Sequence, residues 1–233
     1  MTTTICTIGA RGGSKGVPGK NTRLLAGIPL LAWSIKQART SGLFDLIAVS
    51  SDSEDILRVA KEAGADHLVE RPAEMATDEA SKLPAILHCL LEAERVVGRK
   101  CDVFVDLAAT SPLRAPEDIV DAVSLLHREG ADNVLTAVVA KASPYFSQVE
   151  VAADGSVQLC KLLQERPARR QDAPPCYDLN GSIWVWRRHV FCDAPAILYP
   201  KTRLYMMPEE RSVDIDSELD FRIAEMLAAS LDS

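Results

Sequence analysis

Short runs of apolar and β-branched residues alternate with longer amphipathic segments along most of the chain. Five of these runs predict strands, at Thr3–Ile8, Leu46–Ser50, Asp66–Val69, Asp102–Leu107 and Val134–Val139. The segments between them carry apolar residues at helical spacing, as Ile86, Leu90 and Leu91 do within Ser81–Val97. Strands that alternate with helices form βαβ units and a mostly parallel sheet. We therefore expect an α/β fold, with ligands at the carboxyl ends of the strands.

This alternation stops near Lys141. From there to about residue 205 the chain is richer in proline and in short β-like runs, and Asp154-Gly155 is typical of a hairpin turn. The helical pattern returns in a final helix that begins at Ser217. We expect a single domain over residues 1–233, with a β-rich insertion at about 141–205.

Composition excludes several classes of protein. The chain has 233 residues, of which 47% are hydrophobic and 25% charged, with a formal net charge of -7, and these values are ordinary for one globular domain. No apolar run approaches the roughly 20 residues of a membrane span, and no signal-peptide pattern or long basic stripe occurs. The six cysteines lie far apart and form no metal-ligand cluster. We expect a cytoplasmic protein that binds neither membranes nor nucleic acid.

A glycine-rich loop, ARGGSKGVPGKN at residues 10–21, follows the first predicted strand. Residues 11–23 contain four cations and no carboxylate: Arg11, Lys15, Lys20 and Arg23. The loop matches neither the dinucleotide pattern GxGxxG nor the P-loop pattern. Glycines nevertheless let backbone N–H groups approach an anion closely, and the cations favour a polyphosphate. A solvated surface loop is the alternative, but its place at the carboxyl end of a strand favours the ligand site.

Six sequence blocks in this order resemble those of the acylneuraminate cytidylyltransferases, the CMP-sialic acid synthetases. The blocks are ARxxSKGxPxKN in the loop, VSSDSEDI, RPAEMATDEAS at 71–81, ATSPLRAPEDI at 109–119, LNGSIWV at 179–185 and SVDIDSELDF at 212–221. The resemblance covers nearly the whole chain. It implies a Rossmann-like nucleotidyltransferase fold whose insertion makes a homodimer. It also implies an enzyme that uses Mg²⁺ to transfer CMP from CTP to the anomeric hydroxyl of a nonulosonic, sialic-type sugar acid with nine carbons, releasing pyrophosphate.

The resemblance also implies which residues act. The implied nucleotide-binding residues are Ala10, Arg11, Gly12, Lys20, Asn21, Arg71 and Ser81. The implied sugar-binding residues are Ala108, Thr110, Arg170, Asn180 and Trp184. Asp214 and Asp216 are the implied metal ligands, and the implied catalytic residues are Arg11, Lys20 and Asp216. In this reaction negative charge builds on the leaving pyrophosphate, and positioned cations supply most of the catalysis.

The sugar pocket differs from the pattern of that family at several positions, among them Ala108 and Trp184. Ala108 stands where a sugar-contacting Gln is usual, and Trp184 stands where Tyr is common. A methyl group does not replace the hydrogen bonds of an amide, and sites built on polar contacts discriminate strongly when those contacts change. We therefore expect a donor such as legionaminic or pseudaminic acid, with sialic acid as the alternative.

Other interpretations remain open from the sequence. The chain is alternatively a cytidylyltransferase for Kdo or another sugar class, or a catalytically silent homologue that binds nucleotide. Trp184 and Trp186 alternate on one strand face and are alternatively core or dimer contacts. Asp216 alternatively caps the final helix, although Ser217 and Asp220 already have the spacing of a capping box.

Overall fold

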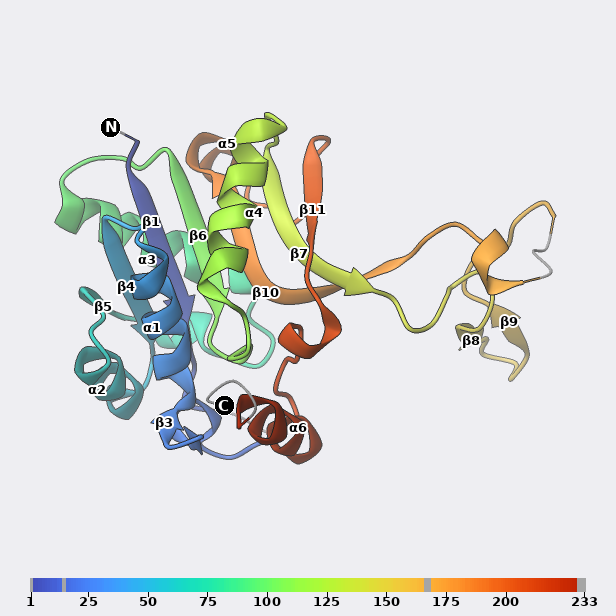
Figure 1. Cartoon of the computed structure of the whole chain (residues 1–233), viewed down its shortest axis with the longest axis horizontal. Helices are drawn as coiled ribbons and strands as arrows, with labels where there is room; N and C mark the ends of the chain where they lie inside the picture. The colour runs from blue at the N-terminus through green and yellow to red at the C-terminus, as the bar shows by residue number, and fades with distance from the viewer. Residues whose placement is uncertain (1, 14–15, 166–168, 230–233) are drawn as a thin grey trace.

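A seven-stranded sheet forms the centre of the computed structural model, which describes residues 2–13, 16–165 and 169–229 (Figure 1). The strand order is β11-β7-β10-β6-β1-β4-β5. The bounds are β1 Thr4–Gly9, β4 Leu46–Ser51, β5 His67–Glu70, β6 Val103–Ala108, β7 Asn133–Val139, β10 Tyr177–Arg187 and β11 Thr202–Met206. β10 is antiparallel to both of its neighbours, and the other pairings are parallel. The mostly parallel α/β sheet predicted from the sequence is confirmed.

Helices cover both faces of this sheet. Their bounds are α1 Leu30–Ser41, α2 Glu54–Glu62, α3 Lys82–Val97, α4 Pro116–Arg128, α5 Arg188–Asp193 and α6 Glu218–Ala228. The apolar faces of α1, α2 and α4 pack in one buried cluster with β1, β4 and β6, and α4 and α1 lie in front of the sheet in Figure 1. The opposite face is covered by α3 and α5, which pack against Phe104 and Trp186. The core is therefore two apolar layers on either side of the sheet.

A third apolar cluster fixes the region where the site forms. Phe221 of α6 is fully buried there with Val17 of the glycine-rich loop and with Ile215, the residue between the two predicted metal ligands. A two-stranded turn, β2 Leu24–Leu25 and β3 Ile28–Pro29, adds Leu25 to the same cluster. Burial of these side chains holds the loop, the segment before α6 and α6 itself against one another.

The segment after β7 leaves the body as an arm, seen at the right of Figure 1. It carries an antiparallel hairpin, β8 Val149–Val151 and β9 Val157–Leu159. Gly155 has φ +83° in the connecting turn, as the Asp-Gly pair predicts. The sequence pattern predicts an insertion at about 141–205, but β10 and β11 belong to the main sheet. The projecting segment is therefore shorter, about 141–176.

The burial of β10 explains this difference in extent. Ile183, Val185 and Trp186 of β10 are fully buried between the two helical layers, whereas Val149 and Val157 of the arm are mostly exposed. A strand that is apolar on both faces belongs inside a sheet that is covered on both sides. The sequence pattern correctly indicates a strand at residues 182–186 but does not show which strands it pairs with.

Candidate nucleotide and metal site

The glycine-rich loop is pinned at both ends to neighbouring elements. The Ala10 amide donates to a carbonyl of β4 at 3.0 Å. The Gly12 amide donates to Asp52 Oδ1 at 2.9 Å, and Asn21 Nδ2 donates to the Arg11 carbonyl at 3.0 Å. Asn21 lies in a short 3₁₀ helix, Lys20–Thr22, and is buried. Both ends of the loop are thus fixed at the carboxyl end of β1, where the sequence predicts a phosphate site. Its residues 14–15, including Lys15, lie outside the described residues.

Lys20 joins this loop to the segment that carries the predicted metal ligands. Its Nζ donates to the Ile215 carbonyl and lies 3.2 Å from Asp216 Oδ1. The Lys20 side chain is largely buried, whereas that of Asp216 is open to solvent. Gly16 approaches the same segment so closely that a Cβ there would stand 2.0 Å from the Asp216 carbonyl oxygen. The structure therefore brings together the two sequence blocks that were expected to hold phosphate and metal.

A cavity of about 280 Å³ lies at this junction. The residues that line it are Gly9, Ala10, Arg11, Gly16, Lys20, Asn21, Thr110 and Asp216. Six of the predicted site residues are among them. The cavity stands at the carboxyl ends of β1 and β6, the edge at which open α/β sheets bind their ligands.

Asp214 and Asp216 both lie on the accessible side of their segment, and Ile215 between them is fully buried. The Ile215 amide donates to the Thr110 carbonyl at 2.9 Å, which fixes the segment to the loop after β6. Crowding by protein atoms raises the pKa of the Asp214 carboxyl, and the neighbouring Asp216 carboxylate raises it further, while a hydrogen bond with Thr110 opposes the shift. Because the two carboxylates repel each other, a cation between them would be favourable.

The residues present fit a hard cation such as Mg²⁺. Within residues 2–13, 16–165 and 169–229 no group of three or more His, Cys, Asp or Glu side chains could hold a metal. Mg²⁺ usually keeps several waters and takes only one or two protein carboxylates. The capping box of α6 is formed by Ser217 and Asp220, with the Ser217 amide 2.8 Å from Asp220 Oδ2. The Asp216 side chain pairs with Lys20 instead and does not cap the helix.

Two arginines lie at the cavity: Arg11 lines it, and Arg71 contacts the lining residue Gly9. Arg11 forms an ion pair with Asp78 at 2.7 Å, which ties the loop to the segment before α3. The Arg71 guanidinium lies against Gly9, where a Cβ would be 2.7 Å away, and donates to the Ser50 carbonyl at 3.0 Å. Burial lowers the pKa of Arg71. Arg11 thus lines the cavity, and Arg71 lies beside its wall at Gly9.

Ser81, the remaining predicted nucleotide contact, is the N-cap residue of α3. Its hydroxyl makes no capping hydrogen bond and the residue is exposed. The side chain is thus available to a ligand at the start of α3.

The predicted sugar-binding residues are not all placed alike. Ala108 pairs with Gly9 at the ends of β6 and β1, and Thr110 lines the cavity. Asn180 is buried, and its amide is engaged within the protein: Thr136 Oγ1 donates to its Oδ1 at 2.6 Å and its Nδ2 donates to Ser212 Oγ at 3.0 Å. Its hydrogen bonds hold β10 to β7 and to the segment before Asp214.

Trp184 packs against Trp186 on the same face of β10. Their ring centroids are 5.6 Å apart in an edge-to-face arrangement, as their alternation on the strand predicts. Trp186 is fully buried, whereas Trp184 is partly exposed. Trp186 is therefore a core residue, whereas part of the Trp184 side chain is exposed to solvent.

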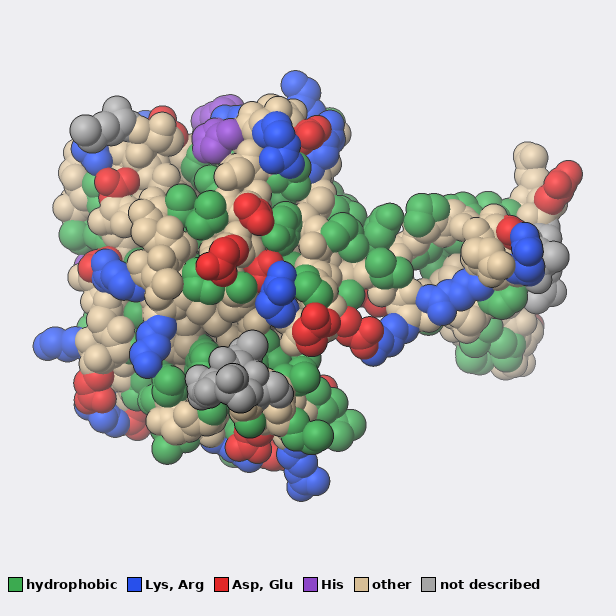
Figure 2. Space-filling model, viewed as in Figure 1, with side chains coloured by type: hydrophobic (Ala, Val, Ile, Leu, Met, Phe, Trp, Pro, Cys, Tyr) green, Lys and Arg blue, Asp and Glu red, His purple; other side chains and the backbone are tan. Residues whose placement is uncertain are grey.

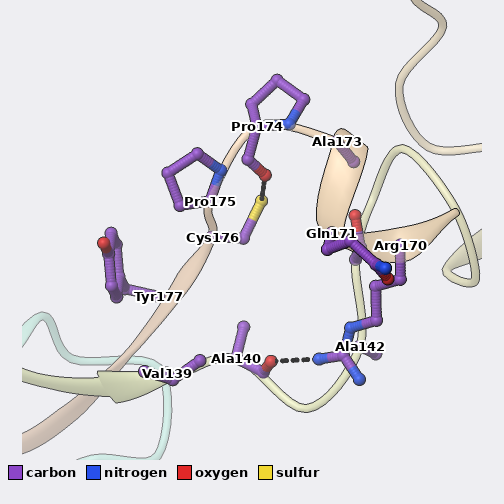
Figure 3. A pocket seen from close by; sticks show the side chains of 11 residues that line it. Val139, Ala140, Ala142, Arg170, Gln171, Ala173, Pro174, Pro175, Cys176 and Tyr177 are labelled. Carbon is purple, nitrogen blue, oxygen red and sulfur yellow. Dashed lines mark hydrogen bonds between the residues drawn. The ribbon is translucent and has the colours of Figure 1, made fainter. Parts of the chain in front are cut away.

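Arg170 lies far from this cavity in the chain fold. It stands on the arm in a 3₁₀ helix, Arg170–Asp172, and donates to the Ala140 carbonyl at 2.5 Å (Figure 3). It lines a separate cavity of about 440 Å³ at the root of the arm, formed by residues 139–140, 142–143, 170–171 and 173–177. None of the described residues of the glycine-rich loop lines that cavity. Within one chain, the structure does not bring Arg170 to the loop.

Three polar residues near the site, Arg114, Asp106 and Lys82, were not predicted from the sequence. Arg114 is fully buried and donates to Ser182 Oγ at 3.0 Å and to the Ala108 carbonyl; burial lowers its pKa to about 10. It thereby orders the loop that follows β6. Asp106 lies on the buried strand β6, paired with Lys82. An acidic residue inside the apolar run DVFVDL was a usable signal, because a buried carboxylate requires a partner.

Comparison with known proteins agrees with this geometry. Residues 5–189 match the protein family described as cytidylyltransferase. The chain belongs to the cytidylyltransferase family. It is 40% identical over 227 residues to the post-translational flagellin modification protein B of Campylobacter coli, covering 97% of this chain and 95% of that protein. It is 39% identical, with the same coverage, to the CMP-N,N'-diacetyllegionaminic acid synthase of Campylobacter jejuni.

The fold of this cytidylyltransferase is also found among solved structures. The structure of CMP:2-keto-3-deoxy-manno-octonic acid synthetase complexed with CTP superposes with a TM-score of 0.70, covering 99% of this chain and 100% of that one. At 15% identity this likeness shows the shared fold alone. Among the described residues, none of the helices is both long and apolar enough to cross a membrane.

Proposed function

We propose that this cytidylyltransferase transfers CMP from CTP to the anomeric hydroxyl of a nonulosonic sugar acid and releases pyrophosphate. The observation that carries the proposal is the junction of Lys20 with Asp216, which places a cationic glycine-rich loop in contact with a pair of carboxylates. A phosphate loop beside a metal-binding segment is the arrangement that nucleotidyl transfer requires.

Each group has a defined task in this reaction. The anomeric oxygen attacks the α-phosphorus, the bond from the α-phosphorus to the bridging oxygen breaks, and the hydroxyl proton passes to solvent. Lys20 and Arg11 bind the β- and γ-phosphates and offset the charge that builds on the leaving pyrophosphate. For Arg11 this requires release from Asp78, its exposed partner at 2.7 Å. Asp214 and Asp216 would hold Mg²⁺, which when bound neutralises phosphate charge.

The sugar acid in this proposal is of the legionaminic type. Ala108 offers only a methyl group at the end of β6, and the Campylobacter jejuni relative with this substrate class in its name aligns over 97% of this chain. Sialic acid and pseudaminic acid are the other nonulosonic candidates. A Kdo-type donor is the alternative outside that class, and a silent nucleotide-binding homologue has no need of the carboxylate pair.

We also propose a cytoplasmic homodimer in which the arm of one chain contributes Arg170 to the sugar pocket of the other. The arm exposes apolar side chains, among them Val149, Val151 and Leu162. Figure 2 shows hydrophobic and cationic side chains together on the arm. Exposed apolar surface of this kind is typical of an interface. A monomer by light scattering that retains full activity at low concentration would refute the dimer.

The test of the function is pyrophosphate release from CTP against a panel of sugar acids. The panel contains N,N'-diacetyllegionaminic acid, pseudaminic acid, N-acetylneuraminic acid and Kdo, each with Mg²⁺ and with a chelator. We expect release with at least one nonulosonic acid, and only with the metal. Release with Kdo alone would move the enzyme to the alternative substrate class, and release with none would favour the silent homologue.

A further inference from the structure

An ion pair between a buried carboxylate and a half-exposed lysine lies on the side of the sheet covered by α3. Lys82 Nζ is 2.9 Å from Asp106 Oδ2, and Thr7 Oγ1 donates to Asp106 Oδ1 at 2.9 Å. The Asp106 side chain is 1% exposed, whereas that of Lys82 is 43% exposed. The ammonium also stands over the Trp184 ring, 4.4 Å from its centroid. The Lys82 ammonium thus contacts a carboxylate and an aromatic ring, and the rest of the side chain is accessible.

The strand register places this pair directly behind the ligand edge. Thr7, Asp106 and Trp184 are side by side across β1, β6 and β10. Toward the carboxyl ends, the next residues on the same face of β1 and β6 are Gly9 and Ala108, which pair with each other. Because neither carries a long side chain, nothing on these two strands stands between the Lys82 row and the cavity.

The open space beside Lys82 is small and shares one lining residue, Gly9, with the cavity. A recess of about 50 Å³ is lined by Lys82, Asp106, Thr7, Arg71 and Gly9 together with residues of α3. Gly9 also lines the 280 Å³ cavity that contains Lys20 and Asp216. This volume suits one polar group and not a base or a sugar ring. An ammonium has three N–H donors, so contact with one carboxylate oxygen leaves donors for a ligand.

We propose that Lys82 binds an acceptor oxygen of the sugar acid, either its carboxylate or the carbonyl of an acylamino group. The inference rests on the proposed function and assigns a contact within it. Arg71, on the nucleotide side, is anchored to Ser50 of β4. Asp106 and Trp184 hold Lys82 toward β6 and β10, on the opposite side of β1. The sugar end of the cavity is therefore the end that Lys82 faces.

The experiment separates binding of the sugar from binding of the nucleotide. Lys82→Met, Lys82→Arg and the double variant Lys82→Met/Asp106→Asn are compared with the wild type for KM of sugar, KM of CTP, kcat and Tm. Lys61→Met is the matched control, because Lys61 is an exposed lysine on α2. The loss of a charge-assisted hydrogen bond predicts a rise of about 10- to 100-fold in the sugar KM of Lys82→Met. We expect CTP KM to stay within about twofold and Lys82→Arg to recover part of the loss.

Two sugar acids, each tested with the wild type and Lys82→Met, identify the acceptor oxygen. One is a nine-carbon sugar acid with acylamino groups, and the other is a sugar acid with hydroxyls in their place, tested as substrate or as competitive inhibitor. If Lys82→Met weakens the binding of both sugar acids equally, the contact is with the carboxylate. If it weakens only the binding of the acylamino sugar acid, the contact is with the carbonyl. Either result supports the proposal.

The proposal fails if sugar KM is unchanged, or if CTP KM rises instead. If Lys82→Met does not fold because Asp106 is left buried without its cation, the double variant removes that charge, and an unchanged sugar KM in it overturns the inference. If the wild type is active on nonulosonic acids and the Lys82 variants keep the same sugar KM, only the role of Lys82 is refuted. A wild type inactive on every sugar acid refutes the proposed function and this inference together.

Discussion

Substitution of Gly16 by alanine tests the contact between the glycine-rich loop and the carboxylate segment. The added methyl would stand 2.0 Å from the Asp216 carbonyl oxygen. Ordinary contact begins at 3.4 Å, so the two segments must separate by about 1.4 Å. A displacement of about 1 Å in a catalytic constellation costs roughly 10²-fold in rate. We therefore expect kcat to fall by about 10²-fold or more in Gly16→Ala.

The same substitution predicts a bounded loss of stability. Overpacking of this kind costs about 1–3 kcal/mol, which for a chain of this size lowers Tm by about 2–12 °C. Gly13→Ala is the matched control, because a Cβ at Gly13 meets no atom within 4 Å. The assays are pyrophosphate release from CTP at saturating substrates and a thermal melt. Turnover at the wild-type level in Gly16→Ala, or an equal loss in Gly13→Ala, would refute the reasoning.

Three further predictions concern the groups around this contact. Lys20→Ala and Arg11→Ala each lower kcat by about 10²-fold or more in folded protein; wild-type turnover in either contradicts its assignment. Asp216→Asn nearly abolishes Mg²⁺-supported activity with little change in metal-free Tm; a fall in Tm with turnover preserved points to capping instead. Because the pKa of Asp214 is raised, the native state holds its proton longer than the unfolded state, so metal-free stability falls as pH rises through that pKa. Asp214→Asn removes this fall, and melts in chelator from pH 4 to pH 7 check it.

The sequence predicts the main sheet and its helices because their signals are local. β4 is buried along its whole length, and α4 begins at Pro116, where the Asp118 carboxylate accepts from the Ala115 amide at 2.8 Å. The position of β10 in the sheet, in contrast, does not follow from a local sequence signal. It pairs with β6 and β7, which precede the arm, and a run of apolar residues does not specify its neighbours. β2 and β3, with two residues each, are too short to show a period.

The site was predictable to a similar degree. The cations and glycines of the loop are adjacent in the chain. Of the two carboxylates that they were expected to meet, Asp216 lines the same cavity, whereas Asp214 lines another. The contact that defines the site joins Lys20 to Ile215, 195 positions apart, and no local pattern reveals it. The same is true of Lys82 and Asp106, whose pairing depends on where α3 begins on the face of the sheet. Asn180 shows the converse case, since a motif residue expected at the sugar has its amide engaged within the core.

The central claim is that the α-phosphorus of CTP passes to a sugar acid at the junction of the loop with Asp216. The most direct measurement follows CTP labelled at the α-phosphate, incubated with Mg²⁺, N,N'-diacetyllegionaminic acid and the protein, with Asp216→Asn in parallel. We predict that the label appears in a CMP-sugar in which phosphorus bridges the anomeric oxygen and cytidine, in step with pyrophosphate release, and that the variant forms almost none. Label found only in CMP or CDP, or the same yield from Asp216→Asn, would contradict the account.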